Sequence, residues 1–319
     1  MKDKILEILK ESDGYCSGEK MSEALNISRA AVWKYIKKFR DEGYEIESVT
    51  NKGYRLVSSP DILSEAEIKA YSKEIKGAIS CVYKTDSTNE EAKRNSSMPD
   101  GSVFIAEIQS SGKGRRGRRW VSDAGDGIWM SILSKPDIAL ADVSKITLAA
   151  GLAVCDAAKR LGIDAEIKWP NDIVVNKKKI CGILTELSAE ADGINYVVTG
   201  IGINVNTKAF APELADKATS VYLEYKRNIP RAQIAAYVIG SFEKRYRELL
   251  SGGIDSLISD YKKVCLTLEK QVHIIRPTEE FDAYATDITP GGELEVERNG
   301  EKIVLNSGEV SVRGIYGYI

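Results

Sequence analysis

The stretch Ile173-Val-Val-Asn-Lys-Lys-Lys-Ile-Cys-Gly-Ile-Leu-Thr-Glu-Leu187 decides the fold class of the central part of this chain. Two apolar runs flank three consecutive lysines, and this pattern predicts a β-hairpin that turns at the lysines. A hairpin pairs its strands antiparallel, whereas a regular βαβ ladder joins parallel strands through helices. We therefore expect an α+β domain with a mixed or antiparallel sheet.

The flanking segments extend this domain over residues 63–267. Period-2 and period-3.6 patterns predict strands at 103–108, 128–133, 166–169 and 196–205, and helices at 143–161 and 234–250. Residues 268–319 contain short alternating runs separated by glycine-rich turns, which predicts a small SH3-like β-barrel.

Residues 1–60 predict a third domain, which the linker Ser58-Ser-Pro-Asp61 separates from the rest. Two short amphipathic helices are followed by a third over 29–42, and a hairpin with its turn at Asn51-Lys-Gly53 comes next. This order is the plan of a winged helix-turn-helix domain, in which the third helix enters the major groove. The alternative is a helical bundle with a solvated basic face.

The third helix carries the charge expected of a DNA-binding surface. Five cations and no acid occur between Arg29 and Arg40, while the apolar residues recur at a spacing that faces the core. The inward residues are expected to be Val32, Tyr35, Ile36 and Phe39. The candidate DNA contacts are Ser28, Arg29, Ala30, Trp33, Lys34, Lys37 and Lys38 on the helix and Lys52 on the wing.

Composition limits the classes of function. The net charge of −2 on 319 residues gives no global basic field, so a DNA contact has to come from a local patch. The five cysteines are scattered without a CxxC pair, which argues against a zinc cluster and a disulfide framework and favours a reducing compartment. No signal peptide or membrane-length apolar run is present, so we expect a cytoplasmic protein without a membrane partner.

One segment has the composition of an anion-binding loop. Gly112-Lys-Gly-Arg-Arg-Gly-Arg-Arg119, here called the basic loop, holds five positive charges, three glycines and no acid. Glycine lets the main chain approach a phosphate, and arginine donates charge-assisted hydrogen bonds to phosphate or carboxylate oxygens. The alternative is an exposed, solvated loop. The only histidine, His273, lies in an alternating run and is expected on the surface of a strand, with a general base as the other interpretation.

Several motifs occur in a fixed order along the chain. They are Asp86-Ser-Thr-Asn89, Gln109 before the basic loop, Lys168-Trp-Pro-Asn-Asp172, Lys179-Ile-Cys-Gly-Ile-Leu184, Gly200-Ile-Gly-Ile-Asn204 and Ser307-Gly-Glu-Val-Ser-Val-Arg313. The ordered set resembles the biotin protein ligases over essentially the whole chain, and with the N-terminal domain it resembles their bifunctional form. Each motif alone is weakly specific.

The resemblance implies a two-step reaction with ATP and biotin as substrates and Mg²⁺ as the metal. The biotin carboxylate attacks the α-phosphate of ATP to give biotinyl-5′-AMP, and a lysine of a biotin carboxyl carrier domain then takes the biotin. Neither step needs an enzyme nucleophile, so positioning and fixed cations carry the catalysis. The resemblance also implies repression of biotin genes by a homodimer, formed with biotinyl-AMP, on a two-fold operator.

The resemblance assigns roles to individual residues. The catalytic residues it implies are Arg115, Lys168 and Lys179. The biotin contacts it implies are Ser87, Thr88, Asn89, Gln109, Gly112, Lys113, Gly114, Arg115, Lys179 and Gly182. The nucleotide contacts it implies are Arg118, Trp120, Asn171, Asp172, Asn204 and Arg313. Asp172 is expected to bind magnesium or to orient a lysine.

Structural interpretations stand beside these roles. The Ser87-Thr88 turn, Asp172 and Asn204 could each cap a helix or a turn, and Trp120 could anchor the loop in the core. Lys113 stands where many members of the family have arginine, so a point charge replaces a bidentate fork. Residues 206–220 are expected to contain the adenine-covering loop, and no stacking residue is assigned there.

Two other functions remain open from the sequence. The chain could be a regulator whose ligase-like domain only senses biotin, although every motif cation is present. It could also ligate lipoate or octanoate, although Gln109, Lys179 and the basic loop fit biotin better.

Overall fold

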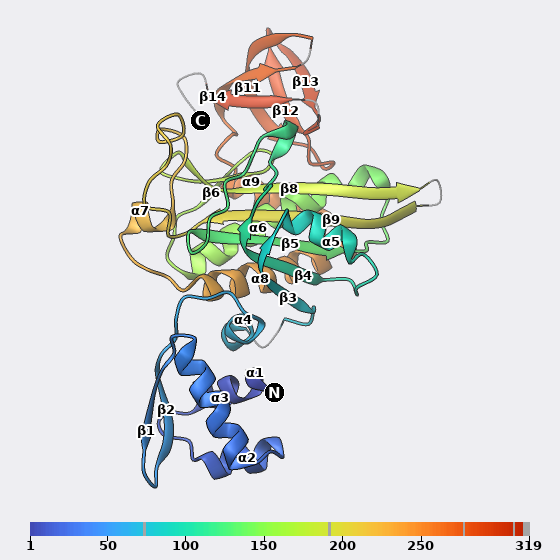
Figure 1. Ribbon diagram of the computed structural model, residues 1–319. Helices are drawn as coiled ribbons and strands as arrows, with labels where there is room; N and C mark the ends of the chain where they lie inside the picture. Colours follow the sequence, from blue (N-terminus) through green and yellow to red (C-terminus); the bar gives the residue numbers. More distant parts are fainter. Residues whose placement is uncertain (73–74, 191–192, 277, 309, 315–319) are drawn as a thin grey trace.

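Three regions follow one another in the computed structural model, from the N-terminal helices to the C-terminal strands (Figure 1). The structure describes residues 1–72, 75–190, 193–276, 278–308 and 310–314. In this part of the chain no helix has the length and apolar character needed to cross a membrane. The domain boundaries at 60, 63 and 267–268 stay predictions.

The N-terminal region has the predicted winged helix-turn-helix architecture. Its elements are α1 (Lys2–Glu11), α2 (Gly18–Leu25), α3 (Arg29–Asp41), β1 (Glu45–Val49) and β2 (Gly53–Ser58). Val32, Ile36 and Phe39 of α3 are buried, as predicted, whereas Tyr35 is half-buried. Gly53 begins β2 with φ at +103°, and a Cβ there would lie 2.2 Å from the carbonyl oxygen of Cys16. The wing therefore needs glycine at this turn.

A short helix that the sequence did not predict, α4 (Glu65–Tyr71), joins this region to the next. Its Glu67 is buried and accepts hydrogen bonds from Lys10 Nζ at 2.5 Å and from Tyr44 Oη at 2.8 Å, both in the N-terminal region. A buried carboxylate is stable only with such partners. The winged helix is therefore attached to α4 by specific polar contacts.

A buried arginine anchors the linker on its other side. Arg231, only 2% exposed, donates from Nε to Asp61 Oδ2 at 3.0 Å and from Nη1 to Glu107 Oε2 at 2.8 Å. Its Nη1 also donates to the carbonyl oxygen of Gly127 at 3.1 Å. The start of the central domain is thus tied both to the linker and to the sheet.

The central sheet has seven strands in the order β3-β4-β5-β9-β8-β7-β6. The strands are β3 (Ile79–Thr85), β4 (Ser102–Gln109), β5 (Gly127–Ser134), β6 (Glu166–Lys168), β7 (Asp172–Val175), β8 (Lys178–Glu190) and β9 (Gly193–Asn204). Only β3 and β4 pair parallel, so the mixed sheet is confirmed. The turn predicted over three lysines is too wide. The residues with positive φ are Asn176 and Lys177, whereas Lys179 already lies in strand β8.

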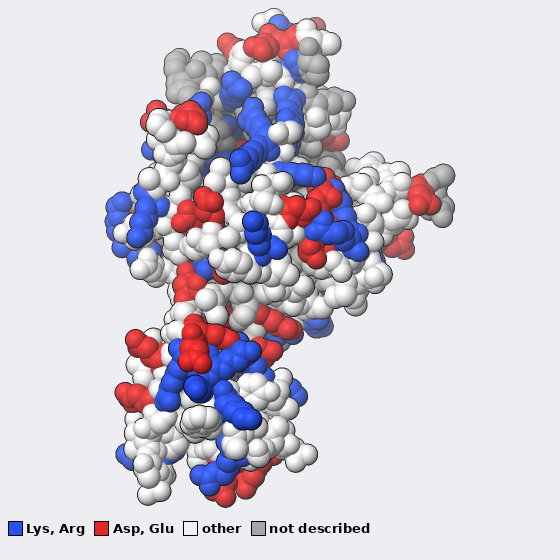
Figure 2. Space-filling model, in the orientation of Figure 1, with Lys and Arg blue, Asp and Glu red and all other residues white. Residues whose placement is uncertain are grey.

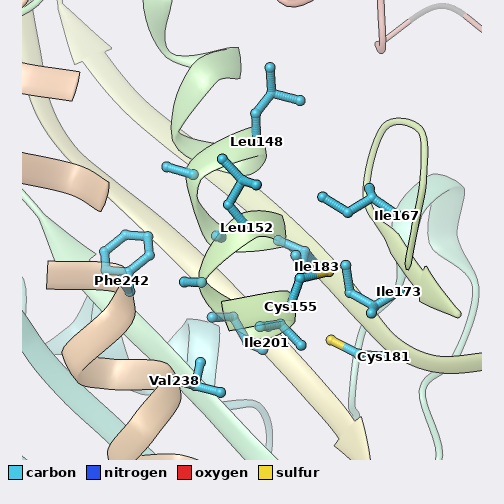
Figure 3. Packing of buried hydrophobic residues seen from close by; sticks show 14 of the residues in the cluster. Leu148, Leu152, Cys155, Ile167, Ile173, Cys181, Ile183, Ile201, Val238 and Phe242 are labelled. Atoms are coloured by element: carbon cyan, nitrogen blue, oxygen red, sulfur yellow. The ribbon is translucent and has the colours of Figure 1, made fainter. Parts of the chain in front are cut away.

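Helices cover one face of this sheet. The helices α6 (Ser144–Arg160) and α8 (Arg231–Leu250) pack on it, and Figure 3 shows Leu152 and Phe242 within the shared core. Cys155 and Cys181 lie in the same core, and all five cysteines are free. The remaining helices are α5 (Thr88–Arg94), α7 (Val221–Tyr225) and α9 (Ile254–Val264). The opposite face of the sheet carries α5, and the candidate ligand site lies on this face.

The C-terminal region is an antiparallel sheet of five strands in the order β13-β12-β11-β10-β14. The strands are β10 (Lys270–Ile275), β11 (Glu280–Ile288), β12 (Leu294–Arg298), β13 (Glu301–Leu305) and β14 (Ser311–Gly314). His273 lies on β10 and contacts Asp282 at 2.7 Å and Glu280 at 3.2 Å, which together raise the pKa of the imidazole. It is therefore a strand-borne histidine paired with carboxylates, outside the central site.

Candidate functional site

A hollow opens on the face of the central sheet that carries α5. It is lined by Ser87, Thr88, Asn89, Gln109, Lys113, Gly114, Arg115, Trp120, Trp129, Met130, Asn171, Lys179, Gly182, Ile183, Leu184, Gly200, Ile201 and Gly202. The motifs that are far apart in the sequence therefore converge on one cavity.

The floor of the hollow is a pair of glycines on neighbouring strands. Gly182 of β8 faces Gly202 of β9 in the ladder register, and the indole of Trp120 lies over both. A Cβ on Gly202 would lie 2.6 Å from Trp120 Nε1, and one on Gly182 would lie 2.9 Å from Trp120 Cζ3. Any side chain at either position would displace the indole. Trp120 also packs edge-on against Trp129, with ring centroids 6.4 Å apart.

The basic loop is folded as a small hairpin beside this floor. The amide of Gly114 donates to Arg118 O at 2.7 Å, and the amide of Trp120 donates to Gly112 O at 2.9 Å. Arg116 adopts a left-handed conformation with φ at +57°, which closes the turn. The backbone of the loop is therefore closed by its own hydrogen bonds.

Arg115 points from the loop to the rim of the hollow. Its Nη1 donates to Asn171 Oδ1 at 2.9 Å, and its Nη2 donates to the carbonyl oxygen of Ser307 in the C-terminal region. Burial lowers the pKa of Arg115. The guanidinium of Arg115 thus joins the basic loop to the connection between β6 and β7 and to the C-terminal region.

A second cationic group adjoins Arg115. Lys179 Nζ pairs with Asp172 Oδ1 at 2.5 Å and lies 5.2 Å from the centroid of the Trp120 ring. Lys168 of β6 is buried and lies opposite Asp172 in the ladder. Desolvation lowers the pKa of Lys168 to about 8, although the negative charge of Asp172 acts to raise it. The charges of Lys179, Arg313 and Arg118 also lower the pKa of Lys168, so these four cations act on the same region. Such a cluster favours an anionic ligand.

Hydrogen-bonding side chains form the opposite wall. Thr88 donates from its amide to Gln109 Oε1 at 2.8 Å, and Gln109 Nε2 donates to Ser122 Oγ at 2.8 Å. Asn89 donates to Glu186 Oε2 at 2.6 Å. Ser87, Thr88 and Asn89 are all buried. The predicted biotin-ring contacts therefore lie together, oriented by the protein.

The structure does not bring every predicted residue to the hollow. Gly112 serves the internal hairpin of the loop, and Asn204 is turned to the carbonyl oxygen of Thr219 at 3.2 Å. Arg118, Asp172, Arg313 and Lys168 surround the hollow without lining it. The lining residues not predicted are Trp129, Met130, Ile183, Leu184, Gly200, Ile201 and Gly202. The alternating glycines Gly200 and Gly202 were a usable signal, because period-2 glycines leave one strand face bare.

The residues at the site do not fit a protein-bound metal ion. Asp172 is already engaged by Lys179, and the described ranges hold no group of three His, Cys, Asp or Glu residues that could ligate a cation. A divalent ion prefers several oxygen ligands. The geometry therefore favours the lysine-orienting role of Asp172 over its predicted metal role.

The predicted DNA-binding residues lie on the exposed side of α3 and on the wing. Ser28 caps the helix by accepting a hydrogen bond from the amide of Ala31 at 3.2 Å. Trp33 is 53% exposed, and Lys37 lies 5.9 Å from its ring centroid. The other predicted contacts are exposed too: Arg29, Ala30, Lys34, Lys38 and Lys52. Figure 2 shows basic side chains gathered on the N-terminal domain.

Comparisons with known proteins agree with this arrangement. Residues 79–204 match the "Biotin/lipoate A/B protein ligase family", residues 2–55 match an "HTH domain", and residues 267–313 match the "Biotin protein ligase C terminal domain". The "Bifunctional ligase/repressor BirA" of Bacillus subtilis (strain 168) is 38% identical over 93% of this chain and 94% of its own length. The protein of the same name from Escherichia coli (strain K12) is 28% identical over 97% of this chain and 96% of its own length.

A solved structure supports the same family. The biotin protein ligase from Aquifex aeolicus in complex with biotin and ATP superposes with a TM-score of 0.68 at 26% identity, and the match covers 74% of this chain and 99% of that one. The fold, the motifs and these relatives together place the chain in the biotin protein ligase family, in its bifunctional ligase/repressor branch.

Proposed function

We propose that the hollow under the basic loop is where this chain joins biotin to AMP. As a member of its family the chain is an ATP-dependent biotin protein ligase and a DNA-binding repressor. The observation that carries the proposed site is that Arg115 and Lys179 both line the hollow, while the buried Lys168 lies close to Lys179 just outside the lining.

The neutral end of the hollow holds the biotin ring in this proposal. Ser87, Thr88, Asn89 and Gln109 offer donors and acceptors that the protein already orients, as a polar ring with an apolar body requires. Gly182, over which the Trp120 indole lies, leaves its strand without a side chain on this side of the sheet. Trp120, whose ring centroid lies 5.2 Å from Lys179 Nζ, is assigned the contact with the nucleotide.

The cationic end of the hollow supports the chemistry. In the first step a biotin carboxylate oxygen bonds to the α-phosphorus of ATP, and the bond from that phosphorus to the pyrophosphate oxygen breaks. In the second step the amine of a carrier lysine attacks the acyl carbon, and AMP leaves with its oxygen. Negative charge accumulates on phosphoryl oxygens in the first step, and the fixed cations Arg115, Lys168 and Lys179 stabilise it.

Several further parts of the function are proposals. Magnesium belongs to the proposal as the counter-ion of ATP, since the described residues provide no metal cluster. The acceptor is the biotin carboxyl carrier domain of a carboxylase. A homodimer with bound biotinyl-AMP would present two α3 helices to a two-fold operator of biotin genes. We place the activity in the cytoplasm, where ATP, carboxylases and operator DNA occur together.

The enzymatic proposal is tested by incubating the protein with biotin, ATP and magnesium and identifying the bound small molecule by mass spectrometry. We expect biotinyl-AMP and release of pyrophosphate without a carrier, and labelling of the carrier lysine once a carrier domain is added. A regulator that only senses biotin would release no pyrophosphate. Lipoate in excess should not compete; strong competition would favour the lipoate alternative.

A further inference from the structure

The first cation of the basic loop is held by a carboxylate on a different element. Lys113 Nζ lies 2.7 Å from Glu90 Oε1, and Glu90 is on α5. Glu90 also accepts a hydrogen bond from Lys93 Nζ at 3.0 Å. Lys113, and Lys93 after it, lower the pKa of Glu90, as two adjacent ammonium groups should. The charge of Lys113 is therefore paired with a carboxylate of the protein and is not directed into the hollow that Lys113 borders.

The contact continues from α5 to the sheet. Lys93 Nζ donates to Glu186 Oε1 of β8 at 2.8 Å, and Glu186 Oε2 accepts from Asn89 Nδ2 at 2.6 Å. Asn89 is buried and its Oδ1 accepts from Ser131 Oγ of β5. The exposed ion pair at the loop is therefore connected to a buried, fixed group.

The same chain of contacts returns to the other end of the loop. Ser131 Oγ also lies 2.8 Å from Thr88 Oγ1, and the amide of Thr88 donates to Gln109 Oε1. Gln109 reaches Ser122, whose Oγ donates to the carbonyl oxygen of Trp120 at 3.2 Å. Hydrogen bonds and ion pairs thus connect Lys113, near the start of the basic loop, with Trp120, the residue that follows its end.

We propose that Glu90 is a positioning residue of the ligase reaction, which holds the basic loop over the hollow through Lys113. The proposal rests on the proposed function of the hollow. It also changes the role of Lys113: the ammonium group tethers the loop, and Arg115 and Lys179 remain to contact the biotin carboxylate and the phosphate.

The two roles of Lys113, tethering the loop to Glu90 or contacting the biotin carboxylate directly, predict opposite effects on the KM for biotin when the Glu90 charge is removed. If Lys113 binds the biotin carboxylate, Glu90→Gln frees its charge and lowers the KM for biotin. If Lys113 tethers the loop, the same change loosens the loop, so the KM for biotin rises and biotinyl-AMP escapes before transfer. Because side chains of Lys113 and Glu90 are 48% and 28% exposed, the expected change is about two- to five-fold.

A charge swap gives the decisive experiment. Pyrophosphate release and labelling of a bystander protein, which reports escaped adenylate, are measured with biotin and ATP for Glu90→Lys, for Lys113→Glu and for the double variant. We expect Glu90→Lys to raise the KM for biotin in the wild-type background and to lower it in the Lys113→Glu background, by about five-fold each way. kcat for a carrier lysine at saturating biotin should change less than KM.

The matched control is Glu65→Lys, which breaks a similarly exposed pair with Lys69 on α4 and should leave the KM for biotin unchanged. Melting temperatures of all variants are compared, because a fall common to the whole set would indicate misfolding, and the swap would then be repeated with Glu90→Gln and Lys113→Gln. The proposal is overturned if Glu90→Gln lowers the KM for biotin or if Glu90→Lys fails to improve Lys113→Glu. Absence of pyrophosphate release in the wild type would instead reject the proposed function.

Discussion

Two segments with five cations each, the basic loop and helix α3, have different architectures. In the basic loop, glycines allow a tight hairpin whose Lys113 and Arg115 turn to Glu90, Asn171 and the C-terminal region. In α3, a capped helix with an apolar inner face presents its cations to solvent. A concave, protein-ordered set of charges suits a small anion, whereas a row of exposed charges suits a polyanion.

The largest expected effect is on the rate of biotinyl-AMP formation when Arg115 of the basic loop is replaced. Arg115→Ala should slow formation of biotinyl-AMP by about 10²–10³-fold, because a preorganised donor to the developing phosphate charge is lost. Arg115→Lys keeps the charge without the planar fork and should fall between. Pyrophosphate release measures both, and binding of duplex DNA by the ligand-free protein should not change. An adenylation rate within a few-fold of wild type would place Arg115 outside the chemistry.

A related prediction concerns escape of the product. Arg115→Gly should release biotinyl-AMP early, because the loop loses its attachments to Asn171 and to Ser307. Mass spectrometry of a bystander protein in the reaction then detects biotin on its lysines. Label confined to the carrier domain would contradict this prediction.

The converse change is made on α3. Lys34→Ala combined with Lys37→Ala should weaken binding to a duplex selected with the wild-type protein by about ten-fold or more and lower the salt slope by about two, if each lysine contacts one phosphate. Adenylation should stay at the wild-type rate. Fluorescence anisotropy at several salt concentrations gives the slope. An unchanged slope would move the DNA contact away from this face.

A smaller effect is expected where the winged helix-turn-helix region is attached to α4. Glu67→Gln removes the charge of a buried carboxylate that accepts from Lys10 and Tyr44, so the free energy of unfolding should fall by about 1–3 kcal/mol. Glu65→Gln on the same helix breaks only an exposed pair and should cost at most about 0.5 kcal/mol. Denaturant unfolding of the full chain compares them, and equal losses would argue against a specific junction.

The smallest expected effect is the uptake of a fraction of a proton by Lys168 when the adenylate binds. Burial lowers the pKa of Lys168 to about 8, so at pH 8 this lysine is partly neutral in the ligand-free protein. An anionic adenylate favours the charged form, and binding should therefore take up about half a proton at pH 8 and much less at pH 6.5. Calorimetry in buffers of different ionisation enthalpy measures the uptake, and Lys168→Arg, which stays charged, should abolish it.

The sequence predicted those features that depend on neighbouring residues. The period of α3, the turn at Gly53 and the apolar runs of β7 and β8 were readable because side-chain spacing alone places them on one face. The motifs also identified most residues around the hollow. The turn between β7 and β8 was misplaced by the run of lysines, since residues with positive φ cannot be recognised from charge.

The rest depended on pairings that no local pattern contains. The register that sets Gly182 opposite Gly202, the contact of Glu90 with Lys113 and the reach of Arg115 to Ser307 each join residues distant in the chain. Amino-acid order settles local conformation and the supply of charge, because both follow from each residue and its near neighbours. Which charges are neutralised, and which are left to meet a ligand, is settled only when packing brings separate elements within a few ångströms, since Coulomb and hydrogen-bond energies depend on that separation.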